Sequence, residues 1–494
     1  LLPNLCIILP ILAGTGLLIW RPESRKVRQW YVMGITLLNS VLALTSIVTA
    51  WQEGVDATRS LLVQFGGNLS ISLAIDGPSM VFGTIISVLW PVTVLYSFEY
   101  MKHEGGENRF FSFLTMSYGV VLGVAFAEDF LSLYLFYELL TLATLPLVMH
   151  GMDRKARYAG KKYLIYSLSG AAFAFIGIVF LMHYGTTLNF TYGGVLNPEL
   201  TAGNERMLLD VFVLAFLGFG VKAALFPGHK WLLRASVAPA PVTALLHAVA
   251  VVKAGVFAVT RLTWYGYGPA LLRGSWAQYL VMGAAIFTIV YGSSKALRTK
   301  HLKRRLAWST ISNLSYVLLG VTTLTTAGLA AGMVHMIFHA VLKITLFFCV
   351  GAVHYKLHRD FVPDVEGCGM LMPIVFGCFA TASLGLMGVP PLAGFTSKWM
   401  LATSAVGLGE WIGYLAAAAL ILSALLTALY LMQIVLLAFF PRQNRQLTVR
   451  VPRQARRDPG IRMILPLITL SVGSVALGLG ANALVGTIQT LLGA

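Results

Sequence analysis

The sequence predicts an all-α membrane protein that crosses the bilayer many times. Apolar residues make up 57% of the 494-residue chain and charged residues only 11%, which is more apolar surface than a soluble fold can bury. Apolar windows of about 20 residues, the length that spans a bilayer, recur along the whole chain. Several windows contain a lysine. A charged side chain at membrane depth is costly, so it normally has an ion-pair partner, contact with water or a functional role.

About fourteen transmembrane helices follow from these windows. The predicted spans begin near residues 1, 30, 76, 109, 129, 161, 207, 241, 274, 302, 329, 372, 408 and 461. The first window, Leu1 to Trp20, has no basic n-region and no small-residue cleavage site, so we predict a transmembrane helix and not a signal peptide. The loops leave no room for a soluble domain. We expect spans 1–3 at 1–108, and a basic inner loop with the last helix at 441–494.

The net charge of +17 predicts topology. Basic residues gather in alternate loops, and the opposite loops hold only Arg59, Arg206, Arg261 and Arg273. By the positive-inside rule, both termini lie on the outer side of a prokaryotic cytoplasmic membrane. The charge therefore does not indicate nucleic acid as a partner.

No cofactor site is visible in the sequence. There is no Gly-rich phosphate loop, no CxxC pair and no Ser/His/Asp arrangement. The cysteines show no metal-ligand spacing and are expected to be small buried residues: Cys6, Cys349, Cys368 and Cys378. We therefore expect no cofactor and no metal in this chain.

Two predicted spans are interrupted in similar ways. The seventh carries Pro227-Gly228 five residues after Lys222, and the twelfth carries Pro390-Pro391 shortly before Lys398. Proline removes a helical hydrogen bond, and irregular backbone at membrane depth must be buried or line a wet cavity. The breaks lie five spans apart, which predicts two inverted five-helix repeats, at 109–265 and 274–440, with broken helices 7 and 12. The alternative is a pair of kinks that serve packing only.

Titratable residues lie deep in five spans. Glu138 of the fifth span could pair with Lys222, either as a functional pair or as a static one. The other candidates are His247 and Lys253 in the eighth span, His335, His339 and Lys343 in the eleventh, and Lys398 in the twelfth. Any single histidine could instead be a hydrogen-bonded core residue.

The spacing of these groups predicts a relay that needs water. His247 and Lys253 are about 9 Å apart along the helix axis, and the residues of the eleventh span share one face at i, i+4 and i+8. Serines and threonines of the tenth span could supply part of the lining. Four buried lysines against one acid favour protons over a metal cation, which lysine would repel.

These residues resemble a known family. Five segments are similar to the antiporter-like subunits of respiratory complex I. They are Phe136-Tyr137-Glu138-Leu139, Lys222 to Leu232, Ala238 to Ala248, His335 to Lys343 and Pro390 to Lys398. The same subunit type occurs in membrane-bound energy-converting hydrogenases and in Mrp-type cation/proton antiporters. The resemblance covers about Ser79 to Phe440.

The resemblance implies a proton relay. Glu138 would face a neighbouring subunit and modulate Lys222, His247 and Lys253 would form the central relay, and Lys398 would be the terminal group near the outer exit. His335 and His339 would match the eleventh-helix histidines, and Lys343 is an additional candidate.

The parent complex is the finer expectation. Lys398 points to the hydrogenase form, the Mrp-type form or the terminal subunit of complex I. That terminal subunit carries a long lateral helix, and the sequence up to Ala494 does not contain one. The segment from Pro239 to His247 fits the redox-linked complexes. A hydrogenase or related redox-driven pump reconciles these features, with iron–sulfur clusters and a nickel–iron centre in partner subunits. The alternatives are an Mrp-type antiporter subunit, a stand-alone sodium/proton exchanger and a b-type cytochrome subunit.

Overall fold

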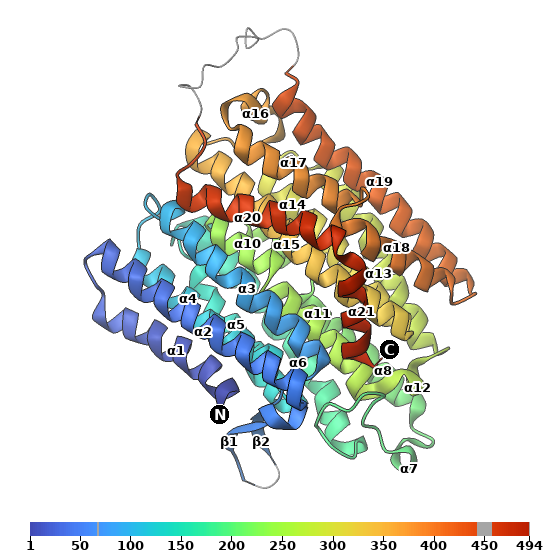
Figure 1. Cartoon of the computed structure of the whole chain (residues 1–494). Helices are drawn as coiled ribbons and strands as arrows, with labels where there is room; N and C mark the ends of the chain where they lie inside the picture. The colour runs from blue at the N-terminus through green and yellow to red at the C-terminus, as the bar shows by residue number, and fades with distance from the viewer. Residues whose placement is uncertain (67–68, 442–456, 494) are drawn as a thin grey trace.

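The chain folds into a bundle of long helices with one small β-hairpin (Figure 1). The computed structural model describes residues 1–66, 69–441 and 457–493. In this part of the chain, eleven helical segments are long and apolar enough to cross a membrane. The predicted seventh, tenth and twelfth spans are not among them, because their helices are interrupted or too polar. The multi-pass helical class is thus observed, and the count of fourteen stays a prediction.

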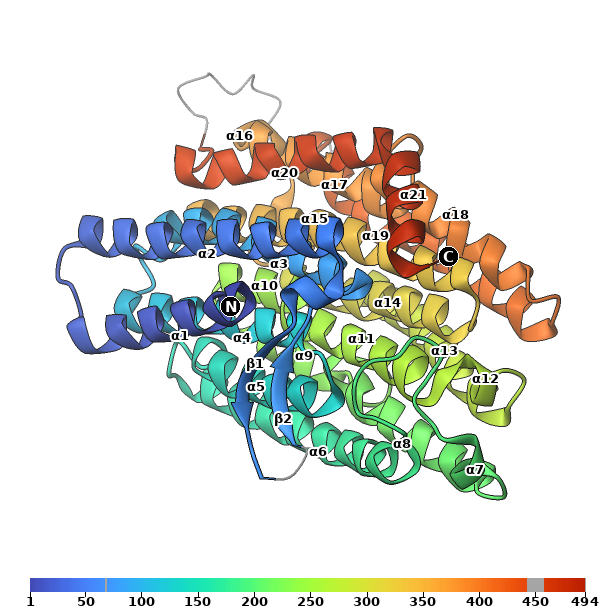
Figure 2. The same ribbon diagram turned by 60° about the horizontal axis from the view of Figure 1, so that its bottom comes forward.

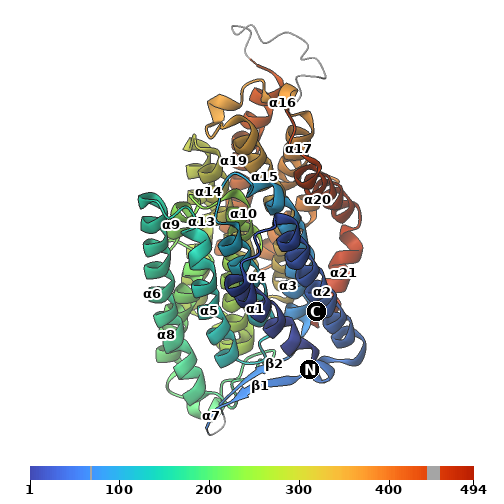
Figure 3. The same ribbon diagram turned by 90° about the vertical axis from the view of Figure 1, so that its left-hand side faces the viewer.

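The N-terminal part holds three long helices and the hairpin. Its elements are α1 (Leu2–Trp20), α2 (Arg25–Glu53), η1 (Val55–Thr58), β1 (Ser60–Gln64), β2 (Ser70–Leu73) and α3 (Gly77–Tyr100). The two strands pair antiparallel, from Ser60 opposite Leu73 to Gln64 opposite Ser70. The hairpin was not predicted, and it lies at the same end of the bundle as the N-terminus (Figure 3).

The middle part carries the first interruption. Its elements are α4 (Glu107–Phe126), α5 (Phe130–Val148), α6 (Arg154–Tyr184), α7 (Pro198–Thr201), α8 (Glu205–Lys222), α9 (Lys230–Ala235), α10 (Ala240–Ala248), α11 (Val251–Arg261), η2 (Leu262–Tyr267) and α12 (Gly268–Leu272). Asp129 and Asp153 begin α5 and α6, because each carboxylate accepts a hydrogen bond from a backbone N–H of the first turn. Helix α8 ends at Lys222, before the Pro-Gly pair.

The following part carries the second interruption. Its elements are α13 (Trp276–Arg298), α14 (Leu302–Thr322), α15 (Thr326–Leu357), η3 (Val362–Val365), α16 (Cys368–Leu371), α17 (Pro373–Met387), α18 (Ala393–Val406) and α19 (Trp411–Phe439). Helix α17 ends just before Pro390-Pro391, as the sequence predicted. The chain then continues in α20 (Ile461–Leu479) and α21 (Ala481–Leu492), which lie along one side of the bundle (Figure 2).

The eighth span contains an interruption that the sequence did not reveal. The N–H of Ala250 donates to the carbonyl of Leu245, five residues back, and the helix restarts at Val251. This wide turn is the hydrogen bonding of a π-bulge. No proline or glycine marks the position, so neither the pattern nor the composition predicted it.

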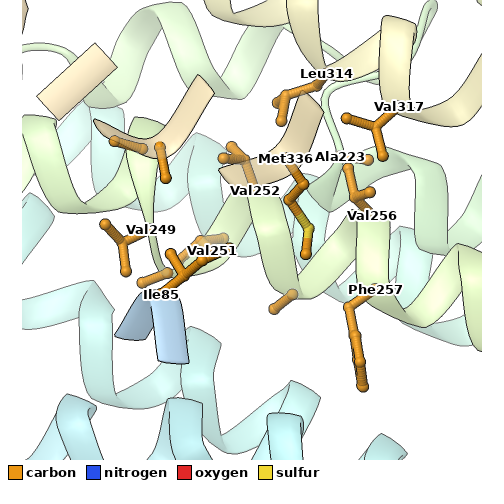
Figure 4. Close-up of a cluster of buried hydrophobic side chains, with 14 of the residues drawn as sticks. Ile85, Ala223, Val249, Val251, Val252, Val256, Phe257, Leu314, Val317 and Met336 are labelled. Atoms are coloured by element: carbon orange, nitrogen blue, oxygen red, sulfur yellow. The ribbon is translucent and has the colours of Figure 1, made fainter. Parts of the chain in front are cut away.

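Helices α11 and α15 form the centre of the bundle. Val252, Val256 and Phe257 of α11 are completely buried, and they lie in a cluster with Leu314 of α14 and Met336 of α15 (Figure 4). The outer helices instead expose large apolar side chains, which is the pattern of a surface that faces lipid. Lys253 of α11 and His335, His339 and Lys343 of α15 are likewise buried within the protein.

One basic residue, Arg261, lies in a helix and not in a loop. Arg261 was assigned to a loop, and this is wrong: it is the last residue of α11 and is completely buried. The basic inner stretch 441–460 falls largely on residues 442–456, which lie outside the described residues.

Candidate proton-transfer site

Lys222 and Glu138 form the first part of the site. The Nζ atom of Lys222 lies 3.2 Å from the Glu138 Oε1 atom and also donates to the carbonyl of Tyr137. The lysine side chain is fully buried, whereas the glutamate is 21% exposed. Lys222 is the last residue of α8, where free carbonyls and the helix dipole favour a cation. The pair suggested by the sequence is thus present, and only its acidic member reaches the protein surface.

Gly255 sets the distance between α8 and α11. A Cβ atom at this position would lie 2.6 Å from the carbonyl carbon of Lys222 and in contact with the backbone nitrogen of Ala223. Only glycine allows this approach of two backbones. The break after Lys222 is therefore held directly against the helix that carries Lys253.

Lys253 and His339 form the second part of the site. The Lys253 Nζ atom and the His339 Nδ1 atom are 3.1 Å apart, and both side chains are buried. The sequence placed these residues on different spans without predicting their contact. No amino-acid spacing could have revealed it, because the contact depends on how α11 and α15 are rotated against each other.

His247 lies beside this pair without a hydrogen bond. Neither of its ring nitrogens has a partner among the described residues, and its ring packs at 4.7 Å from the ring of Phe347. A buried imidazole without partners is costly unless water satisfies it. Its position in α10, before the wide turn at Ala250, therefore favours a hydrated space.

Helix α15 carries three titratable groups on one face, as predicted. The Nδ1 atom of His335 lies 3.0 Å from the Ser397 hydroxyl, and the rings of His335 and His339 are 6.2 Å apart. The Nζ atom of Lys343 donates to the carbonyl of Leu306 at 3.2 Å. At this separation the two histidine rings do not hydrogen-bond to each other directly.

Lys398 lies at the second interruption. Its Nζ atom donates to the carbonyls of Leu386 and Met387 at 2.6 and 3.1 Å. These are the last carbonyls of α17, which a helix end leaves without intrahelical partners. The Tyr316 ring lies 5.6 Å from this ammonium group and stacks on His335 with 5.1 Å between ring centres. Tyr316 thus joins Lys398 to the α15 histidines.

Sequence reasoning missed the pair formed by the buried Arg261 and the partly exposed Asp76. The guanidinium group contacts both carboxylate oxygens at 2.5 Å and the Ser79 hydroxyl at 2.9 Å. The rings of Phe190, Phe257 and Tyr265 surround it at 4.3 to 4.8 Å. Asp76 also begins α3 by accepting from the Ser79 N–H. This pair fastens the end of α11 to the start of α3 and, within the described residues, does not contact the lysines.

A second missed feature is a polar cavity of about 260 Å³ beside the start of α10. Its lining includes Glu104, His301, Lys303, His354 and Asp360. The hydrogen bond from His354 holds the pKa of Asp360 below its usual value. The cavity brings charged groups to one end of the helices that carry His247 and Lys343.

No metal centre is apparent in the described parts of the chain. They contain no group of three or more histidine, cysteine or acidic side chains placed to hold a metal ion. All four cysteines are buried and free.

The fold and the row of buried titratable groups define a class of protein, a polytopic helical membrane protein with ionisable side chains along its centre. A family model described as NADH:quinone oxidoreductase/Mrp antiporter, TM, matches residues 127–427. A second model, described as NADH-ubiquinone oxidoreductase (complex I), chain 5 N-terminus, matches residues 63–111. The first match covers more than half of the chain, which therefore belongs to the NADH:quinone oxidoreductase/Mrp antiporter transmembrane family.

Individual relatives come from both branches. NADH-quinone oxidoreductase subunit N of Desulforudis audaxviator is 31% identical over 83% of this chain and 82% of that protein. NADH-quinone oxidoreductase subunit L of Mycobacterium tuberculosis is 30% identical over 98% of this chain and 76% of that protein. One Na(+)/H(+) antiporter subunit of Alkalihalophilus pseudofirmus is 31% identical over 76% of this chain, which spans about half of that protein (48%).

Solved structures share the fold along nearly the whole chain. A chain of the Mrp complex of Dietzia sp. DQ12-45-1b matches with a TM-score of 0.85 at 20% identity, over 99% of this chain and 96% of that one. A chain of the archaeal membrane-bound sulfane sulfur reductase matches with a TM-score of 0.83 at 22% identity, over 99% of this chain and 97% of that one. A chain of respiratory complex I from Thermus thermophilus matches with a TM-score of 0.81 at 21% identity, over 99% and 98%. The chain is thus an antiporter-like subunit of the complex I and Mrp type.

Proposed function

We propose that this chain moves protons across the membrane as one subunit of a larger membrane complex. The observation that carries the proposal is the row of buried groups, in which Glu138 contacts Lys222, Lys253 contacts His339, and Tyr316 connects His335 to Lys398. Buried charges in membrane segments are costly and are characteristic of ion and proton pathways.

In the proposed mechanism, a neighbouring subunit controls the Glu138–Lys222 pair. Glu138 is partly exposed between the exposed side chains of Leu135 and Leu142, whereas Lys222 is enclosed. A partner that docks on α5 can therefore attract or repel the carboxylate without touching the lysine. A change in the separation of the pair decides whether Lys222 keeps its proton.

The proton then passes along the centre of the bundle. His247, Lys253, His335 and His339 relay it through water toward Lys398, and Lys343 is an additional member. The interruptions at 223–229 and 388–392 lie at the two ends of this row, and we propose that they occupy equivalent positions in inverted repeats at 109–265 and 274–440. Fourteen spans with both termini outside complete the topology in a prokaryotic cytoplasmic membrane.

For the parent complex, we propose a redox-driven pump, such as an energy-converting hydrogenase, with iron–sulfur and nickel–iron centres in its partners. A component of an Mrp-type sodium/proton antiporter is the second candidate, because relatives of both kinds match this chain. A stand-alone exchanger ranks below both, since the described row contains one acid against four lysines and so lacks a carboxylate-rich cation site.

Affinity purification separates these candidates. The tagged chain is isolated in mild detergent from its host, and co-purifying proteins are identified by mass spectrometry. Iron–sulfur and hydrogenase or quinone-reducing subunits support the redox-driven pump. Small membrane subunits alone support the Mrp-type antiporter, and a chain that purifies alone and still exchanges ions contradicts a role as a subunit.

Lys222→Ala tests the relay itself. We expect this variant to assemble into its complex and to lose coupled proton transport, because the group that exchanges its proton with the centre of the bundle is gone. Lys222→Met is the control for a packing defect, because methionine keeps most of the side-chain volume while removing the charge. Normal transport in both assembled variants would refute the mechanism.

A further inference from the structure

A set of buried hydroxyl groups lies outside the row of lysines and histidines. Helices α13, α14 and α19 pack together on one side of the bundle (Figure 2). They carry two hydroxyl clusters whose members are completely buried. The first consists of Ser309, Thr427 and Tyr430, and the second of Ser293, Ser312, Tyr316 and Ser423. We call the two clusters together the hydroxyl branch.

Short hydrogen bonds connect the members of each cluster. The Tyr430 hydroxyl lies 2.6 Å from the Ser309 hydroxyl and donates to the Thr427 hydroxyl at 3.2 Å. In the second cluster, the hydroxyl of Ser293 lies 2.5 Å from that of Ser423 and 2.8 Å from that of Ser312. A hydroxyl both donates and accepts, so a line of them can accept a proton at one end and release another at the opposite end.

The branch reaches the proposed relay through Tyr316. The Tyr316 hydroxyl donates to the carbonyl of Leu420 at 3.4 Å and lies close to the hydroxyl of Ser423. The ring of the same tyrosine stacks on His335 and lies beside the Lys398 ammonium. The second cluster therefore ends at the part of the relay farthest from Lys222.

The other end of the branch reaches the basic end of α14. Arg305, one turn before Ser309, donates to the carbonyl of Tyr430 and to the side-chain oxygen of Gln433, both at 2.9 Å, and Gln433 is exposed. From Arg305 to Tyr316 is eleven residues, or ~16 Å along the helix, which is about half of the ~30 Å hydrocarbon core. The branch thus extends from the membrane boundary to its middle.

Asn313 marks the gap between the clusters. It lies one turn beyond Ser309 on the same face of α14, and its Nδ2 atom donates to the Ser309 carbonyl. Its Oδ1 atom is buried and has no hydrogen-bond partner among the described residues. A buried acceptor of this kind is normally satisfied by protein or by ordered water, so a water molecule here would join the two clusters.

Building on the proton transport proposed above, we propose that the hydroxyl branch is a second proton path, which supplies His335 and Lys398 from the basic end of α14. Lys343 meets α14 at the carbonyl of Leu306, and the hydrogen bond that it makes there does not involve a member of the branch. The alternative role of interhelical hydroxyl bonds is to hold helices together, and the experiment below separates the two roles.

Tyr430→Phe is the test, and Tyr118→Phe is its matched control. Both substitutions remove one buried hydroxyl that makes a 2.6 Å bond to a serine on another helix, Ser309 in one case and Ser40 in the other. Only Tyr430 belongs to the branch. A structural role would therefore affect both variants alike, whereas a conducting role affects only Tyr430.

The measurement is proton transport by the whole complex in sealed membrane vesicles, in H₂O and in D₂O. We expect Tyr430→Phe to slow transport at least about tenfold and to raise the solvent isotope effect, with assembly and thermal stability as in Tyr118→Phe. Equal transport rates and isotope effects in the two variants overturn the proposal. Lys222→Ala, measured in the same vesicles, tests the proposed function separately. Normal proton transport in this variant would refute the proposed function, whichever result the Tyr430→Phe variant gives.

Discussion

Removing the charge of Glu138 is the most direct test of the ion pair. Glu138→Gln keeps the side-chain shape and an oxygen that accepts a hydrogen bond from Lys222, so the substitution removes little except the negative charge. For unit charges separated by 3.2 Å, Coulomb's law gives an attraction of about 1 kcal/mol in water and about 5 kcal/mol at an effective dielectric constant of 20. The pair is partly buried, so the true value lies between these limits.

This magnitude predicts a large effect on transport. Since about 1.4 kcal/mol changes an equilibrium constant tenfold, we expect Glu138→Gln to reduce coupled proton transport by about tenfold or more. Assembly should persist, because Glu138 is partly exposed and its amide replacement can still bond to Lys222. The assay is the initial rate of proton transport by the purified complex in liposomes, normalised to the driving reaction.

Glu107→Gln is the control for general loss of an ion pair. Glu107 also pairs with basic residues, the buried Arg28 and the exposed Arg25, but it lies at the start of α4, away from the relay. We expect near-normal transport in this variant. Equal transport in Glu138→Gln and the wild-type protein, or an equal loss in both variants, would refute the assigned role of the Glu138 charge.

Two further predictions concern the support of the site. Asp76→Asn should lower the free energy of unfolding by about 3–5 kcal/mol, because it leaves the Arg261 guanidinium buried among aromatic rings without its anion. Thermal unfolding in detergent measures this loss. An unchanged unfolding midpoint would contradict the reasoning. Gly255→Ala should impair transport and stability, because its Cβ atom would collide with the backbone at Lys222, whereas Gly283→Ala meets no atom within 4 Å and should be neutral in the same assays. Indistinguishable results for the two glycine variants would show that the close approach is unimportant.

The sequence predicted much of the fold because the bilayer restricts the choices. A membrane segment must be apolar and helical over about 20 residues, so the positions of most spans can be read directly from the chain. The same restriction makes Lys222, Lys253, Lys343 and Lys398 conspicuous, since a lysine at that depth needs a reason. The interruptions after Lys222 and before Lys398 were predicted because proline marks them.

The contacts between spans could not be predicted in the same way. Spacing along a helix gives the depth and face of a side chain, but the rotation of one helix against another depends on packing over the whole bundle. The contact between Lys253 and His339 and the pairing of Arg261 with Asp76 both depend on that rotation. Arg261 was therefore misplaced in a loop, because its charge alone does not reveal the Asp76 carboxylate that it meets.

The sequence by itself predicted most of the apolar helices and the lysines, histidines and glutamate that lie within them, because hydrophobicity and charge are properties of single residues. The tertiary structure alone decided which titratable groups meet, where α10 and α11 separate without a proline, and that the hydroxyls of α13, α14 and α19 form connected clusters. Those features depend on distances of about 3 Å between separate helices, and such distances follow only from the close packing of the complete fold.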